Sequence, residues 1–84
     1  MIPRIGYNGS NMISIEQGPH EFFFSYNTLV AYRGPLGRAR IAAISQTTGK
    51  HLKVMHVDDF PTLHTEDDLR EFITSSIEEW DEKE

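Results

Sequence analysis

The sequence predicts an α+β fold, in which an antiparallel β-meander of about four strands carries a short helix and a C-terminal amphipathic helix packed on one face. Three observations predict it. The first half is rich in β-branched and aromatic side chains with strand-like alternation, turn dipeptides interrupt these stretches, and the C-terminal stretch has apolar side chains at helical spacing. With 84 residues, the chain is expected to form a single domain over residues 1–84.

The first predicted element is a β-hairpin. Asn8-Gly9 is a dipeptide that tolerates the two positive φ angles of a type I′ turn. It would connect arms at residues 4–7 and 11–16, and the second arm alternates between polar and apolar side chains. Gly18-Pro19 then interrupts the chain.

Two further strand stretches follow the hairpin. Residues 22–33 are β-branched and aromatic with a period of two, although Asn27-Thr28 offers a place to bend or turn. The Gly-Pro-Leu-Gly run at residues 34–37 predicts a turn. Residues 38–45 then form a strand with two arginines on one face and three apolar residues on the other, so an antiparallel meander is the simplest topology.

The second half is expected to be helical. Thr47-Thr48 predicts the cap of a short helix with Leu52 and Met55 on one side. Thr65 with three acidic residues directly after it marks the start of a longer helix, because the helix dipole favours negative charge in the first turn. The side chains that follow at helical spacing form one largely apolar stripe: Leu69, Phe72, Ile73, Ser76, Ile77 and Trp80.

Charge is distributed unevenly along the chain. Residues 1–57 hold six basic residues against two acidic ones, whereas residues 65–84 hold nine acidic residues against two basic ones. The formal net charge of -5 argues against phosphate-backbone binding by the whole surface. No apolar run is long enough to span a bilayer, no signal segment opens the chain, and there is no cysteine, so a cytosolic location is expected.

Two blocks of sequence carry a resemblance. Residues 23–33 read Phe-Phe-Ser-Tyr-Asn-Thr-Leu-Val-Ala-Tyr-Arg, and residues 47–52 read Thr-Thr-Gly-Lys-His-Leu. Together they resemble a family of small bacteriophage and archaeal-virus proteins of unknown function with a Phe-Ser-Tyr-x-Thr-x-Val-Ala-aromatic-Arg block and a Thr-Thr-x-x-His block. The resemblance covers residues 21–53 and is not mapped onto the acidic helix beyond Phe60. It implies a viral accessory protein and supplies no catalytic residues.

Residues within these blocks have two interpretations. In the structural one, Thr48 as a cap and His51 one turn later fix the short helix against the sheet, and Tyr26 is a polar residue at a bend of its strand. Buried tyrosine and histidine side chains need hydrogen-bond partners in any case. In the functional one, Tyr26, Arg33, Lys50 and His51 form a ligand-binding cluster. Both interpretations remain open at the level of sequence.

Enzymatic sites find little support. Gly49-Lys50 is no phosphate-loop motif, because the required glycine and hydroxyl positions hold Ile44 and His51. Residues 47–50 leave open a looser anion site at a helix N-terminus. Side chains with metal-ligand chemistry cluster in a probable loop without a recognised spacing: His56, Asp58, Asp59 and His64. We therefore predict no enzyme, no catalytic residue, no metal and no cofactor.

One candidate function is binding of a nucleotide or of single-stranded nucleic acid. Basic side chains on a hairpin and in the Thr-Thr-Gly-Lys-His turn would supply charge, with tyrosines nearby for stacking. The opposing interpretation makes the tyrosines core residues and the arginines a solvated edge. The candidate anion-binding residues are Arg33, Arg38, Arg40, Lys50 and His51.

The leading hypothesis is that the acidic helix binds a host protein complex and modulates or inhibits it, as an anti-defence protein in the host cytoplasm. The choice of a host target follows from the viral resemblance and not from any residue. A strongly acidic face attracts a basic groove and speeds association. The acidic residues at the C-terminal end oppose the helix dipole, a local conflict of a kind found at functional sites. The chain is expected to be a monomer or homodimer. The candidate partner-binding residues are Asp67, Asp68, Glu71, Glu78, Glu79 and Glu82.

Overall fold

A computed structural model describes residues 3–9, 11–42 and 46–83. Within these residues the chain forms six strands and two helices, which confirms the α+β class but exceeds the four strands predicted. The elements, in chain order, are β1 (Arg4–Gly9), β2 (Met12–Gln17), β3 (His20–Ser25), β4 (Thr28–Gly34), β5 (Gly37–Ile41), α1 (Gln46–Val54), β6 (Thr62–Leu63) and α2 (Glu66–Lys83).

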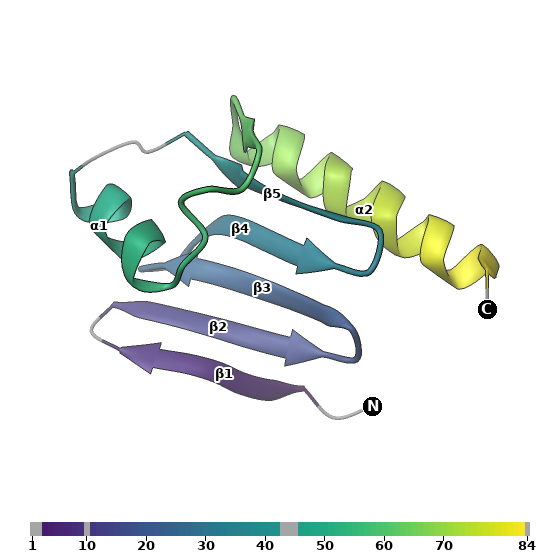
Figure 1. Ribbon diagram of the computed structural model, residues 1–84, viewed down its shortest axis with the longest axis horizontal. Coiled ribbons are helices and arrows are strands. Elements are labelled where there is room, and N and C mark those ends of the chain that lie inside the picture. Colours follow the sequence, from purple (N-terminus) through teal and green to yellow (C-terminus); the bar gives the residue numbers. More distant parts are fainter. Residues whose placement is uncertain (1–2, 10, 43–45, 84) are drawn as a thin grey trace.

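The strands lie in one sheet in the order of the chain, β1 to β6 (Figure 1). Neighbours from β1 to β5 are antiparallel, which confirms the predicted meander. β6 departs from it and runs parallel to β5, with Arg40 opposite Thr62 and Ile41 opposite Leu63. A strand of two residues is too short to show a period of two, so the sequence pattern could not reveal it.

The first hairpin turns at a different place from the one predicted. Asn8 and Gly9 belong to β1 and pair with Ile13 and Met12, so the strand continues through the dipeptide that was predicted to turn. Asn11 has a φ of 60° and supplies the left-handed conformation that had been assigned to Asn8-Gly9. The prediction was wrong because a β-bulge in β1 shifts the register, and no local pattern encodes that shift.

The aromatic stretch forms two strands joined by a tight turn. The turn lies at Tyr26 and Asn27, one residue before the bend anticipated at Asn27-Thr28, and Tyr26 has a φ of 56°. The backbone N–H of Tyr26 donates a hydrogen bond of 2.6 Å to the carbonyl of Asn11, which joins this turn to the first hairpin. The Gly-Pro-Leu-Gly turn is confirmed by the pairing of Gly34 with Gly37. Residues 43–45 of the last predicted strand lie outside the described residues.

The short helix α1 begins before the predicted cap. Gln46 is its first residue, so Thr47 and Thr48 lie in its first turn and not at its cap, and Thr48 is buried. Leu52 faces the core as expected. The helix is followed by His56 in the left-handed conformation, with a φ of 62°, and the N–H of Val57 donates to the carbonyl of Leu52 at 2.9 Å.

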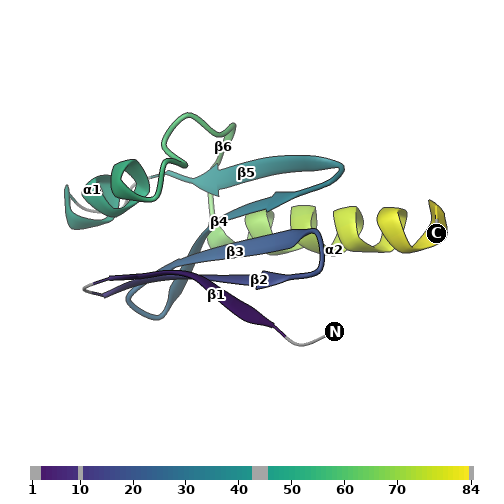
Figure 2. The same ribbon diagram turned by 60° about the horizontal axis from the view of Figure 1, so that its bottom comes forward.

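The sheet carries one helix on each face (Figure 2). Phe22 and Phe23 are neighbours in β3 and so point to opposite faces. On one face, Phe22 and Tyr32 form a layer that Phe72 of α2 joins through an edge-on ring contact of 6.1 Å. On the other face, the Phe23 ring meets the Phe60 ring at 6.3 Å, beneath α1 and the segment that follows it.

The long helix α2 matches its prediction. Thr65 Oγ1 accepts a hydrogen bond of 3.1 Å from the N–H of Asp68, which is the geometry of an N-cap. Leu69 is fully buried and the rest of the stripe is buried or half-buried. Glu66 is not merely part of a solvated face, because its carboxylate accepts a hydrogen bond of 3.2 Å from the backbone N–H of Leu29.

Candidate functional site

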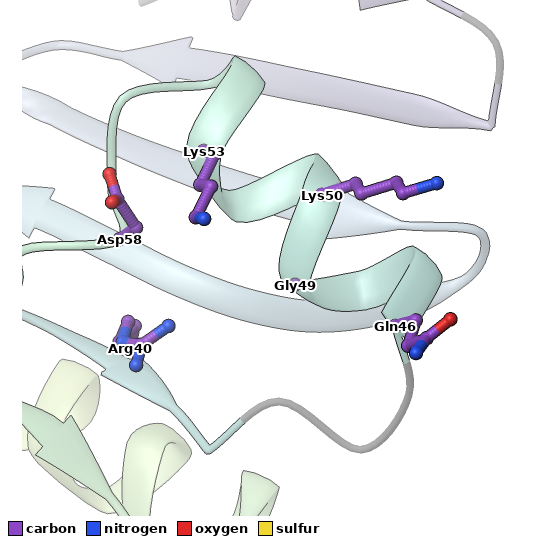
Figure 3. A pocket seen from close by; sticks show the side chains of 6 residues that line it. All are labelled: Arg40, Gln46, Gly49, Lys50, Lys53 and Asp58. Atoms are coloured by element: carbon purple, nitrogen blue, oxygen red, sulfur yellow. The ribbon is translucent and has the colours of Figure 1, made fainter.

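A basic cleft lies between α1 and β5 (Figure 3). Its volume is about 510 Å³, and it is open to solvent. Its lining comes from β5, from α1 and from the segment after α1: Arg40, Gln46, Gly49, Lys50, Lys53 and Asp58.

Local structure explains how the basic side chains reach the cleft. Arg40 and Arg38 are two residues apart on β5 and project from the same face as α1. The Nε of Arg40 donates a hydrogen bond of 3.1 Å to Thr62 Oγ1, so β6 holds this side chain in place. Lys50 and Lys53 are three residues apart and lie on one side of α1. Figure 3 shows Lys53 directed towards the gap above Arg40, whereas the Lys50 side chain extends outwards from the helix, away from Arg40.

The electrostatics of the cleft favour an anion. Three cations face one carboxylate, that of Asp58. The ion pairs found among the described residues are Arg4–Glu16, Arg33–Glu21 and Arg70–Glu66, and none of them involves a cleft residue. The guanidinium and ammonium groups of the cleft are therefore available to a ligand.

The remaining predicted hairpin arginines are engaged elsewhere. The Arg33 guanidinium forms an ion pair with Glu21, which also accepts a hydrogen bond of 2.9 Å from the Ser14 hydroxyl. The Arg38 guanidinium lies over the Phe60 ring at 5.2 Å. Both project from the face that carries α1, but only Arg40 of the three lines the cleft.

His51 points to the sheet and not into the cleft. It is 8 % exposed, and its Nδ1 lies 2.6 Å from the hydroxyl oxygen of Ser25, which is itself buried. The Tyr26 ring lies beside the imidazole at 5.7 Å. A serine and a histidine at this distance invite comparison with a nucleophile and its base. Their burial keeps a substrate away, so the contact fits the structural interpretation.

Sequence reasoning missed two residues of the cleft, Lys53 and Asp58. The spacing of Lys50 and Lys53 on one helix was a signal that could have found the first. Asp58 reaches the cleft only because the chain turns back after α1, and no spacing rule encodes that path. Of the four charged residues that line the cleft, Arg40 and Lys50 were predicted as anion-binding residues, whereas Lys53 and Asp58 were not.

Metal and membrane sites were also sought. Across residues 3–9, 11–42 and 46–83, no group of three or more histidine and acidic side chains is arranged to hold a metal ion. Of the helices that the structure describes, neither is long and apolar enough to cross a bilayer.

The predicted acidic residues lie on α2, away from the cleft. Their described members are exposed to solvent, and the side chain of Glu82 is not described. α2 packs on the face opposite to α1, and its C-terminal turns extend past the end of the sheet (Figures 1 and 2). The structure therefore separates the two candidate surfaces in space. The exposed acidic residues are Asp67, Asp68, Glu71, Glu78 and Glu79.

Comparison with protein families identifies the chain. A profile described as "Family of unknown function (DUF8033)" matches residues 4–73, from the first residue of β1 to Ile73 in α2. The chain belongs to this family. The family match extends on both sides of residues 21–53 and continues past Phe60, beyond the limits of the sequence resemblance described above. Comparisons with curated proteins and with solved structures give no match.

Proposed function

We propose that this protein binds a phosphate-bearing ligand, a nucleotide or single-stranded nucleic acid, in the basic cleft between α1 and β5. The observation that carries the proposal is that three cationic residues from two elements line one open cavity, and none of them has an ion-pair partner among the described residues. Uncompensated cations at a concave surface focus a positive potential on anionic ligands.

Arg40 and Lys53 suit complementary roles. Arg40 is held by Thr62, and a preorganised guanidinium donates in fixed directions to phosphate oxygens. Lys53 projects from α1 into the same gap and supplies a mobile charge (Figure 3). Gly49 has no side chain, so that part of the cleft wall is helix backbone. The carboxylate of Asp58 lowers the net positive charge of the cleft. It also favours a ligand that carries a hydrogen-bond donor beside its phosphate.

Binding of fluorescently labelled oligothymidylate and of a labelled adenine nucleotide, measured by anisotropy over a range of salt concentrations, tests the proposal. The variant carries Arg40→Ala and Lys53→Ala together. We expect at least a tenfold loss of affinity, and for the oligonucleotide a salt slope smaller by about 1.4, since each phosphate contact to a single strand contributes about 0.7. The matched control carries Arg4→Ala and Arg70→Ala, two exposed cations outside the cleft, and retains affinity. An equal loss of affinity in both variants would mean that the ligand is attracted by the protein's basic residues in general and not by the cleft, which would contradict the proposal.

A second candidate is the binding of a basic host protein by the acidic surface of α2. The projection of its C-terminal turns past the sheet favours this role, because a partner reaches them without steric hindrance. The resemblance to bacteriophage and archaeal-virus proteins supports a viral origin and a modulator or inhibitor of a host complex. Charge reversal by Glu71→Lys and Glu78→Lys should abolish capture of a nuclease-resistant partner, while the cleft variant still captures it. Capture by neither the wild type nor the cleft variant would rule out this candidate.

A further inference from the structure

One half of the sheet lacks a covering helix. α2 packs against β4, β5 and β6, and α1 lies on the opposite face. On the α2 side, β1, β2 and the edge of β3 that adjoins β2 therefore present a face that no described helix covers, while Phe22 and Phe24 of β3 line cavities together with α2 (Figure 1). Three strands at the usual spacing of about 4.8 Å span about 10 Å, which is the width of one helix.

The centre of that face is apolar, with Asn8, Gln17 and His20 at its ends. Residues directly opposite each other in a β-ladder share a face. Ile15 pairs with Ile5 on one side and with Phe22 on the other, and Ile13 pairs with Phe24. Phe22 contacts Tyr32 in the α2 layer, which assigns the whole set to the α2 side. Ile5 is 61 % exposed, whereas the other four apolar residues are half-buried.

A groove runs along α2 above this face. One cavity of about 300 Å³ is lined by Phe22 and Phe24 of β3 and by Ile73 of α2, among others. A second cavity of about 360 Å³ is lined by Phe22 again, together with Ile77 and Trp80 of α2. Because Phe22 lines both, the two cavities are neighbours along the same side of the helix.

The helix side of the groove is acidic. Arg70 and Thr74 line the first cavity and Asp81 lines the second, so they mark the flank of α2 that faces the groove. Asp67 and Glu78 lie three or four residues from these positions and share the flank. Arg70 forms an ion pair with Glu66 at 3.2 Å. The other three carboxylates of this flank, those of Asp67, Glu78 and Asp81, have no ion-pair partner among the described residues.

We propose that this groove binds an amphipathic helix of a partner protein, with its apolar stripe on β1 to β3 and its lysines or arginines along the acidic flank of α2. The helix would complete the layer that α2 begins. The chemistry disfavours the α2 of a second copy, because its exposed side is acidic and would desolvate carboxylates against isoleucine and phenylalanine. The proposal is independent of the phosphate ligand, since the cleft lies on the opposite face.

Trp80 reports binding directly, because it is the chain's single tryptophan and lines the groove. The probe is an 18-residue helical peptide of leucine and lysine with a 3.6-residue apolar period and no aromatic residue. The control peptide has glutamate in place of lysine. We expect the lysine peptide to shift the emission of Trp80 saturably to the blue and the glutamate peptide to bind at least tenfold more weakly.

Two pairs of variants locate the site. Ile5→Lys places a charge on the exposed edge of the apolar floor and should weaken the lysine peptide at least tenfold, whereas Val54→Lys, at an exposed apolar residue of α1, should not. Glu78 lies on the groove flank of α2, whereas Asp68 lies on the far flank. Glu78→Lys should therefore lower the affinity for the lysine peptide more than Asp68→Lys does.

Three results would overturn the proposal. Equal affinity for both peptides would mean that the groove does not select charge. Retention of lysine-peptide binding by Ile5→Lys would place the peptide elsewhere. Sedimentation showing a dimer that Ile5→Lys dissociates, with no peptide binding, would assign the groove to a second copy of the chain.

Discussion

The hydroxyl oxygen of Ser25 lies 2.6 Å from Nδ1 of His51, a buried hydrogen bond that joins the end of β3 to α1. These residues come from the two sequence blocks, residues 23–33 and 47–52. Their contact gives the pairing of the blocks a physical reason, because it secures the short helix over the sheet. By fixing α1, it also fixes the position of Lys50 and Lys53 above β5.

Removal of this hydrogen bond should destabilise the protein. Ser25→Ala leaves the His51 nitrogen buried without its partner, which costs about 1–3 kcal/mol of unfolding free energy. Urea denaturation followed by circular dichroism measures the loss. Ser75→Ala, at an exposed serine of α2, serves as the control and should change stability by less than about 0.5 kcal/mol. Similar values for the two variants would mean that the contact does not hold α1 in place.

Glycine should be better than histidine at position 56. His56 is exposed and has a φ of 62°, a conformation that costs an L-residue about 1–2 kcal/mol and glycine almost nothing. After allowance for the greater freedom of glycine in the unfolded chain, His56→Gly should raise the unfolding free energy by about 0.5–1 kcal/mol. Thermal and urea unfolding measure this gain. His64→Gly, at an exposed histidine without a positive φ, should instead lower stability.

The N-cap of α2 should contribute measurably to stability. Thr65→Ala removes the acceptor for the Asp68 N–H and should cost about 1 kcal/mol, whereas Thr65→Ser keeps the hydroxyl and most of that stability. Urea denaturation of both variants checks the prediction. Equal loss in Thr65→Ser and Thr65→Ala would assign the effect to the methyl group.

Stability should fall in alkaline solution because of Tyr32. Desolvation by burial raises the pKa of Tyr32 above its ordinary value. The folded protein therefore keeps this proton at pH values where the unfolded chain loses it, and the free energy of unfolding falls as the pH rises above about 10. Tyrosine ionisation followed by ultraviolet absorbance should show a late component, which ionises at a higher pH than an exposed tyrosine.

Two variants assign that component. Tyr32→Phe should remove the late component, while Tyr26→Phe, at a tyrosine that is 55 % exposed, should leave it in place. A late component that persists in Tyr32→Phe would contradict the assignment. Tyr32→Phe should also lower stability at neutral pH, since it removes the hydrogen bond of 2.7 Å between the Tyr32 hydroxyl and Nδ1 of His20.

Local signals predicted the elements that local interactions form. The cap at Thr65 and the 3.6-residue period after it are properties of adjacent turns, so α2 was predictable along most of its length. The turn of the first hairpin was misplaced because its register depends on a bulge in β1 and on pairing with β2. Neither feature is encoded in the dipeptide that was taken as the turn.

The candidate site was predictable only in part. Arg40 was assigned to the correct face by alternation along its strand, and Lys50 by its place in the Thr-Thr-Gly-Lys-His turn. The same alternation put Arg38 on the face of Arg40, whereas it left the face of Arg33 open, and the acidic and aromatic neighbours of Arg33 and Arg38 come from other strands and loops. Charge in the sequence therefore could not distinguish an arginine that contacts other residues of the protein from one that is available to a ligand.

The amino-acid sequence was enough to predict the α+β class, an antiparallel meander, the face of α2 that is buried and the division into a basic and an acidic end. These properties arise from residues close together in the chain. Only the tertiary structure decided that β6 joins β5, that His51 turns inwards to Ser25, and that Arg40 and Lys53 meet in one cleft. It also decided that α2 leaves the apolar face of β1, β2 and the adjoining edge of β3 uncovered. Such contacts join residues distant in the sequence, and the packing of the whole chain selects them.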